Sequence, residues 1–100
     1  MSSVSRGTSP GKLLGSNFQV TWYNDQGKTA SGVYVQDGVT VATDPKVIPT
    51  GSLIEITFPD GHKLVREAHD TGGKVKGNIV DIYANVTTSE LYRRGRTHGV

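Results

Sequence analysis

Residues 69–83 read HDTGGKVKGNIVDIY, a strand-like apolar run preceded by a glycine-rich loop. Within it, NIVDIYA (78–84) alternates as a β-strand does, with successive side chains on opposite faces. Asp81 then shares one face with Ile79 and Tyr83. A charge at that position is either an ordinary residue on a solvated face or a carboxylate held on a rigid strand beside apolar surface.

Three aspartates in this part of the chain are candidates for chemistry. If the face of Asp81 is apolar, desolvation raises the pKa of its carboxyl group and keeps a proton available at neutral pH. Asp70 opens the tetrapeptide DTGG, which is typical of a turn but also brings a carboxylate and several backbone amides to one spot. Such amides can line a binding site for a sugar or an oxyanion. Asp44 precedes Pro45, where aspartate commonly ends a strand.

Short alternating segments with turn signals between them fill most of the chain. The predicted strands cover residues 17–23, 32–35, 38–43, 52–58, 62–68 and 78–84. Gln36-Asp37-Gly38 and Pro59-Asp60-Gly61 predict hairpin turns. Thr87 and Glu90 fit a capping box for one short helix, and Gly95 fits the position just past its end. The pattern predicts an all-β (mainly β) fold, a small six-stranded barrel with one short helix near the C-terminus.

Composition excludes several classes of function. The chain has 100 residues, a net charge of +2 and no cysteine. This length suits one domain with a modest core, and the charge is too small for a dedicated nucleic-acid binder. No apolar run reaches the roughly 20 residues of a membrane span. Residues 1–16 are rich in Ser, Gly and Thr and lack the apolar core of a secretory signal, so we expect a flexible arm or linker before a domain over residues 17–100.

Nucleotide and metal chemistry fit the sequence poorly. Counting a phosphate-binding loop from Gly72 puts its second glycine at Gly77, but Asn78 and Ile79 follow instead of Lys and Ser or Thr. The three histidines have no metal-ligand spacing, and without cysteine there is no thiolate site. We therefore expect neither a metal nor a cofactor.

Three segments, VTWYNDQGKTASG, VATDPKVIPTGSLIEI and AHDTGGKVKGNIVDIY, occur in an order that resembles the 3D domain, named for three aspartates. This domain is found in bacterial stationary-phase survival cell-wall enzymes and in the catalytic part of membrane-bound lytic transglycosylase A. The likeness runs from Thr21 to Gly95, and D-T-G-G-x-x-K-G-x-x-x-D is its most specific part. It implies a double-psi β-barrel that acts on the glycan strands of peptidoglycan.

The resemblance also implies roles for individual residues. Asp81 would be the catalytic acid, and Asp70 and Asp44 would complete an acidic cluster that raises its pKa. Further residues implied along the substrate groove are Thr21, Tyr23, Thr71, Gly72, Gly73 and Lys76. The implied reaction is that of a lytic transglycosylase, in which one carboxylic acid protonates the bond between N-acetylmuramic acid and N-acetylglucosamine. Its carboxylate then takes the proton of the C6 hydroxyl as a 1,6-anhydro ring closes.

Two other functions stay open from the sequence. One is a glycan hydrolase on the same barrel, which ordinarily needs two carboxyl groups with room for water. The other is a non-catalytic wall-binding or structural module of a larger assembly, such as a phage tail. Members of the family usually continue with another strand after the position of Gly95, so a neighbouring chain in a homo-oligomer is one way to complete the barrel. The expected location is the cell wall, outside the cytoplasm, or a phage virion.

Overall fold

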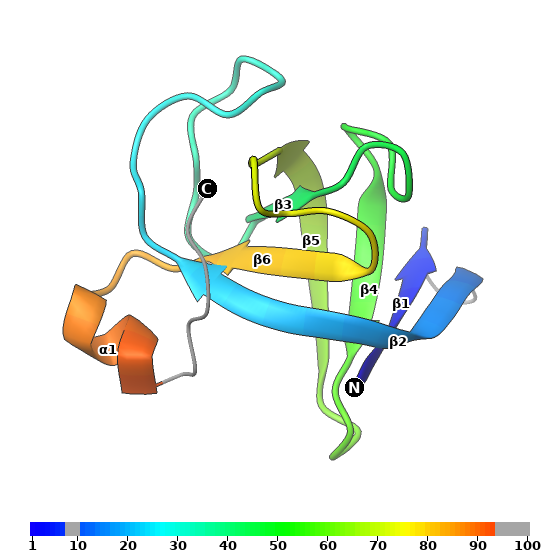
Figure 1. Cartoon of the computed structure of the whole chain (residues 1–100). Coiled ribbons are helices and arrows are strands. Elements are labelled where there is room, and N and C mark those ends of the chain that lie inside the picture. The colour runs from blue at the N-terminus through cyan, green and yellow to red at the C-terminus, as the bar shows by residue number, and fades with distance from the viewer. Residues whose placement is uncertain (8–10, 94–100) are drawn as a thin grey trace.

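The computed structural model describes residues 1–7 and 11–93 and shows a closed barrel of six strands with one short helix (Figure 1). The elements are β1 (Ser2–Arg6), β2 (Lys12–Tyr23), β3 (Thr40–Thr43), β4 (Leu53–Thr57), β5 (Lys63–Asp70), β6 (Ile79–Tyr83) and α1 (Thr88–Arg93). Around the barrel the strand order is β1–β2–β6–β3–β5–β4, and β1 closes the circle by pairing with β4. The predicted mainly β barrel with one helix near the C-terminus is confirmed.

Two of the strand pairs are parallel, β2 with β6 and β3 with β5, and the rest are antiparallel. Each long connection passes over a strand that lies between the two it joins. Residues 24–39 lead from β2 to β3 past β6, and residues 71–78 lead from β5 to β6 past β3. These interlocked crossings agree with the double-psi barrel that the resemblance implies. They also place both connections over the outer face of β6 and β3.

Alternation along the strands sorts the apolar side chains into two clusters. The barrel interior holds Val4, Phe18, Val41, Ile48, Ile54, Ile56, Ala68, Val80 and Ile82. A second cluster, here called the outer cluster, consists of Tyr23, Ala42, Val75 and Tyr83. It lies on the opposite face of β2, β3 and β6, where Val75 of the 71–78 connection packs down on it. The face that carries Asp81 is therefore covered by apolar side chains.

The expectation of a flexible arm over residues 1–16 is wrong for the part of it that the structure describes. Ser2–Arg6 form β1, and β2 already begins at Lys12. Val4 pairs with Ile56 and is completely buried in the barrel interior, and β1 is hydrogen-bonded to β2 on one side and β4 on the other. Because β1 closes the barrel, a strand from a neighbouring chain is not needed to complete it.

The predicted strand over residues 32–35, with its hairpin to 38–43, is also wrong. Residues 24–39 form an irregular connection in which only Lys28 and Tyr34 make a β-bridge. The last residues of this connection form a turn rather than a hairpin between two strands, and the N–H of Val39 donates to the carbonyl oxygen of Gln36 at 3.1 Å. Val35 is half-buried against the outer cluster, so the apolar residues here reflect packing onto the barrel rather than a barrel strand.

The second hairpin and the start of the helix lie where the sequence predicts them. Gly61 has a φ of +90°, which favours glycine, and the N–H of Phe58 donates to the carbonyl oxygen of His62 at 2.8 Å. The Thr87 hydroxyl accepts a hydrogen bond from the N–H of Glu90 at 3.2 Å, as a capping box requires. Gly95 lies outside the described residues. Over residues 1–7 and 11–93, no helix has the length and apolar character needed to span a membrane.

Val4→Ala tests whether the N-terminal segment belongs to the barrel. We expect it to lower the free energy of unfolding by about 1–3 kcal/mol, because it removes buried methyl groups and leaves a cavity in the core. The control is Leu13→Ala, whose side chain is 61% exposed and whose loss is expected to cost less than about 0.5 kcal/mol. Chemical denaturation measures both variants. Equally small losses would make the segment a loosely attached arm.

Candidate functional site

The strand register brings the candidate residues into one row across four strands. Thr21 of β2 pairs with Asp81 of β6. Asp81 in turn pairs with Ala42 of β3, and Ala42 pairs with Asp70 of β5. Register partners point to the same side of a sheet, so these side chains lie together on the outer face. We call this set the aspartate row.

A β-bulge turns Asp70 onto this face. Val41 pairs with Ala68, but the next residue, Ala42, pairs with Asp70, so that His69 is the extra residue in β5. Ala68 points into the barrel, and strict alternation would send Asp70 inward as well. The bulge instead directs its carboxyl group outward, toward the side on which Asp81 lies.

Asp81 is completely buried, with an exposed fraction of 0%. The hydroxyl group of Thr21, which is equally buried, donates a hydrogen bond to its Oδ1 at 2.8 Å. Burial of this kind disfavours the ionised form of a carboxyl group. The interpretation of Asp81 as an ordinary residue on a solvated face is therefore wrong.

Asp70 joins three segments of the chain at the end of β5. Its Oδ2 accepts a hydrogen bond from the Tyr23 hydroxyl at 3.0 Å. Its Oδ1 accepts hydrogen bonds from the backbone N–H of Ala30 at 3.1 Å and of Thr71 at 2.9 Å. One half-buried carboxyl group thus ties β2 and the 24–39 connection to the start of the 71–78 connection.

Tyr23 connects β2 to Asp70 of the aspartate row. Its ring is completely buried and packs edge-on against Tyr83, with ring centroids 5.4 Å apart. Burial raises the pKa of Tyr23 far above its ordinary value, and the charge of Asp70 and its hydrogen bond with the Tyr23 hydroxyl raise it further. The phenol therefore stays neutral, and its hydroxyl donates the hydrogen bond to Asp70.

Alkaline pH tests the environment of Tyr23. Its raised pKa contributes stability that is complete below about pH 10, the ordinary pKa of tyrosine, and that is lost as the pH rises. We expect the free energy of unfolding to fall above this pH, by at most about 1.4 kcal/mol per pH unit from one group. Tyr23→Phe should remove this alkaline loss and cost about 1–2 kcal/mol at neutral pH, since the hydrogen bond to Asp70 disappears.

Urea denaturation of the wild-type chain and of Tyr23→Phe across the alkaline range measures this effect. Tyr34→Phe is the matched control, because Tyr34 is 66% exposed and should leave the alkaline loss in place. An unchanged alkaline loss in Tyr23→Phe would contradict the assignment.

Asp44 lies one residue beyond β3, on the side of Ala42 by alternation. It is 8% exposed, and its Oδ2 accepts a hydrogen bond from the backbone N–H of Gly77 at 2.8 Å, while Oδ1 accepts one from that of Lys46 at 3.0 Å. These hydrogen bonds, that of Gly77 first, hold the pKa of Asp44 below its ordinary value. Asp44 therefore clamps the turn after β3 to the 71–78 connection.

A cleft of about 280 Å³ opens beside Asp70. Its walls are formed by Asp25, Gln26, Lys28, Val35, Asp70 and Thr71. Carboxylate, amide and hydroxyl groups suit a ligand that, like a sugar, carries many hydroxyl and amide groups. Sequence reasoning missed the residues from the 24–39 connection. Their one signal in the sequence is the polar run NDQGK (24–28) directly after β2.

Comparisons with known proteins place the chain in a family. A family model described as "3D domain" matches residues 39–99, a stretch that contains Asp44, Asp70 and Asp81. The chain belongs to the 3D-domain family. This family is associated with cell-wall-degrading enzymes. The chain is also similar to the SPbeta prophage-derived uncharacterized protein YorM of Bacillus subtilis (strain 168), with 37% identity over 62 residues. That match covers 56% of this chain and 26% of YorM.

The remaining residues that the resemblance assigns to this 3D domain fall into two groups. Thr21 and Tyr23 are completely buried and contact the aspartates, which favours a positioning role over contact with a substrate. The others lie in the 71–78 connection, where Gly73 and Lys76 are exposed and Thr71 and Gly72 are half-buried.

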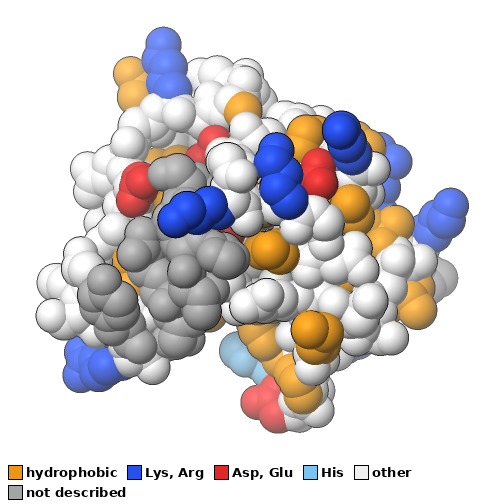
Figure 2. All heavy atoms as spheres, viewed as in Figure 1, with side chains coloured by type: hydrophobic (Ala, Val, Ile, Leu, Met, Phe, Trp, Pro, Cys, Tyr) orange, Lys and Arg blue, Asp and Glu red, His pale blue; other side chains and the backbone are white. Residues whose placement is uncertain are grey.

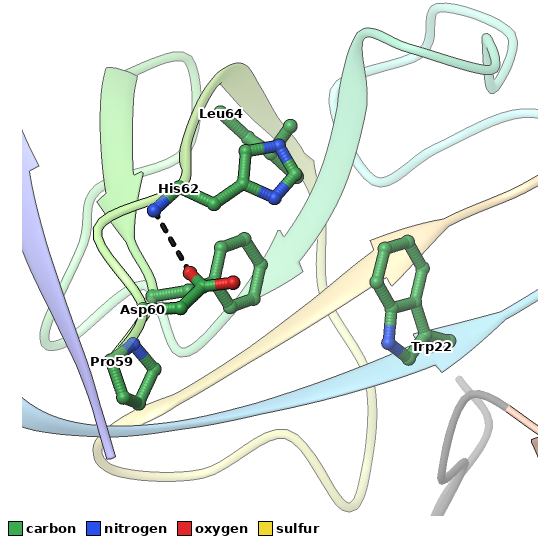
Figure 3. A pocket seen from close by; sticks show the side chains of 6 residues that line it. Trp22, Pro59, Asp60, His62 and Leu64 are labelled. Carbon is green, nitrogen blue, oxygen red and sulfur yellow. Dashed lines mark hydrogen bonds between the residues drawn. The ribbon is translucent and has the colours of Figure 1, made fainter.

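A larger cavity of the 3D domain, about 430 Å³, lies away from the aspartate row. It is lined by Trp22, Phe58, Pro59, Asp60, His62 and Leu64 (Figure 3). Trp22 follows Thr21 on β2 and so points to the other face of the strand. The Asp60 carboxylate is exposed and accepts the N–H of His62 at 2.9 Å within the hairpin turn. We place the site at the aspartate row because a buried carboxyl group and its positioning partners converge there.

His69, the extra residue of the bulge, secures the 24–39 connection of the 3D domain from a second side. Its Nδ1 lies 3.1 Å from the Ser31 hydroxyl, and its Nε2 lies 2.7 Å from Glu67 Oε1. The N–H of Ser31 also donates to the carbonyl oxygen of His69 at 3.0 Å. Across the described part of the chain, no three or more His, Asp or Glu side chains gather as they would to hold a metal ion.

Proposed function

We propose that this 3D domain cleaves the glycan strands of peptidoglycan as a lytic transglycosylase. The observation that carries the proposal is the complete burial of Asp81 on a strand, in one row with Asp70 and beside a polar cleft. The association of the family with cell-wall-degrading enzymes supports it. The place of action proposed is the cell wall or a phage virion, which the prophage-derived relative supports.

In the proposed reaction, Asp81 carries its proton before cleavage, since burial disfavours the carboxylate. It protonates the oxygen that links N-acetylmuramic acid to N-acetylglucosamine while the bond from this oxygen to C1 of the muramyl ring breaks. The Asp81 carboxylate then takes the proton of the C6 hydroxyl as the C6 oxygen bonds to C1 and closes the 1,6-anhydro ring. Asp81 ends the cycle protonated, and no water is consumed.

Neighbouring side chains support these steps. The Thr21 hydroxyl fixes the orientation of Asp81 through its hydrogen bond to Oδ1. Asp70, held by the Tyr23 hydroxyl, supplies negative charge near the oxocarbenium-like transition state. A sugar ring that reaches the buried Asp81 must displace part of its cover, and we assign the approach to the cleft that opens beside Asp70.

Digestion of purified peptidoglycan tests the proposal. The soluble fragments are separated and analysed by mass spectrometry, and fragments with anhydro-muramyl ends are expected. Reducing ends would assign the barrel to a glycan hydrolase. Retention of the protein on the wall without any soluble release would assign it to a non-catalytic binding module.

A further inference from the structure

We infer that Lys46 and Lys76, on either side of Asp44, bind a carboxylate on the peptide stems of peptidoglycan and so orient the glycan strand across the aspartate row. The inference rests on the proposed function for its substrate and adds the chemical group by which this substrate is recognised. It concerns an edge of the site to which no catalytic step is assigned.

The clamp made by Asp44 brings the two lysines together. The two carboxylate oxygens of Asp44 accept hydrogen bonds, one from the backbone N–H of Lys46 and one from that of Gly77, the residue after Lys76. These hydrogen bonds lower the pKa of Asp44, and the charges of Lys76 and Lys46 lower it further. The two hydrogen bonds therefore hold the backbone at Lys46 and the backbone next to Lys76 against one carboxylate, although the two lysines come from separate connections.

The ammonium groups of these lysines are available for a ligand, because Asp44 bonds backbone N–H groups and, among the residues that the structure describes, forms no ion pair with them. In the described ranges, 1–7 and 11–93, none of Lys46, Lys74 and Lys76 forms an ion pair, whereas Lys63 pairs with Glu55 at 3.9 Å. All three are exposed. Figure 2 shows basic side chains gathered where Figure 1 places the connections from β3 to β4 and from β5 to β6.

The backbone beneath these lysines is anchored beside the aspartate row. Val75, which lies between Lys74 and Lys76, is completely buried in the outer cluster with Tyr23 and Ala42. A buried residue in the middle of the connection holds its two exposed neighbours at the rim of the site. The positive charge is therefore a fixed part of the site's edge and not a mobile tail.

The charge of the site differs between its two sides. Apart from Asp44 itself, the charged side chains of the two segments that it clamps are all lysines. The cleft at Asp70 instead has two carboxylates, those of Asp25 and Asp70, against one lysine, Lys28. In peptidoglycan the lactyl groups are bonded to peptide stems, and these stems carry free carboxylates. Charge complementarity favours the stems on the lysine side and the neutral sugar rings toward the cleft.

The test compares two charge-matched double variants. Lys46→Gln with Lys76→Gln removes the lysine pair, and Lys12→Gln with Lys63→Gln removes one lysine from β2 and one from β5. The clamp uses backbone N–H groups, so both variants are expected to keep the fold. The probe is purified peptidoglycan freed of phosphate-containing polymers with hydrofluoric acid, used once as such and once with its carboxyl groups converted to neutral amides. Binding is measured by co-sedimentation in the cold, where cleavage is slow.

We expect the Lys46/Lys76 variant to bind the acid-treated wall about tenfold more weakly than wild type, a loss in the range of two partly exposed ion pairs. Amidation of the wall should weaken binding of the wild-type chain by a similar factor. It should not weaken binding of the Lys46/Lys76 variant any further. An equal loss of binding in the Lys12/Lys63 variant would overturn the inference. Wild-type binding that is unchanged by amidation would overturn it too. So would wild-type binding that disappears with the phosphate polymers.

These results are separable from those that test the proposed function. Lysine-dependent binding without anhydro-muramyl products would reject the transglycosylase and keep the carboxylate site. Anhydro-muramyl products from a Lys46/Lys76 variant that binds as wild type does would reject the carboxylate site alone.

Discussion

Asp81→Asn is expected to lower the rate at which soluble fragments leave purified peptidoglycan by about 10²–10⁴-fold, the usual loss when a general acid is removed. Asparagine has the size of aspartate, and its side-chain oxygen can accept the Thr21 hydrogen bond seen at 2.8 Å. It cannot deliver a proton to the glycosidic oxygen or take one from the C6 hydroxyl. The change therefore removes the acid and base chemistry while the packing of β6 is kept.

The matched control is Asp60→Asn, on the exposed β4–β5 hairpin, which should keep the wild-type rate. Circular dichroism and the melting temperature of Asp81→Asn should stay close to those of the wild-type chain. A folded Asp81→Asn variant with near wild-type release would remove Asp81 from its catalytic role.

Replacements of Asp70 are expected to have the second-largest effect and to separate its structural role from its charge. Asp70→Ala removes the acceptor for Tyr23, Ala30 and Thr71 together, and we expect it to lower the free energy of unfolding by about 3 kcal/mol. Activity should fall with it, because both connections that frame the cleft lose their common anchor.

Asp70→Asn keeps an oxygen for the two backbone N–H groups, so its stability should stay within about 1 kcal/mol of wild type. If the charge of Asp70 supports the transition state, this variant should still lose about 10–100-fold in rate, the range of one electrostatic contribution of about 1.4–2.7 kcal/mol. Denaturation and release rates are measured on both variants. An Asp70→Asn chain as active as wild type would leave Asp70 only its anchoring role.

The patterns that the sequence revealed correctly are local ones. Alternation in NIVDIYA put Asp81 on the face of Ile79 and Tyr83, and Tyr83 indeed belongs to the outer cluster. The Pro59-Asp60-Gly61 turn and the Thr87 cap depend on neighbouring residues alone, so their signals were sufficient.

The features that the sequence did not reveal depend on distant partners. β1 is part of the barrel because Val4 pairs with Ile56 of the neighbouring strand β4, and the segment SSVSR alone does not indicate that contact. The bulge at His69 exists only in the pairing of β5 with β3, yet it decides which way Asp70 points. The resemblance identified Asp44 as one of the three aspartates, but its use as a clamp depends on the N–H of Gly77, which lies 33 residues away.

Product analysis in water enriched with the heavy oxygen isotope tests the central claim most directly, that Asp81 acts alone as acid and then base without consuming water. Purified peptidoglycan is digested in this water by the wild-type chain, and the new muramyl ends are weighed by mass spectrometry. Anhydro-muramyl ends without heavy oxygen are predicted. Reducing ends that carry heavy oxygen would contradict the account, because they would show that water and not the C6 hydroxyl attacks C1.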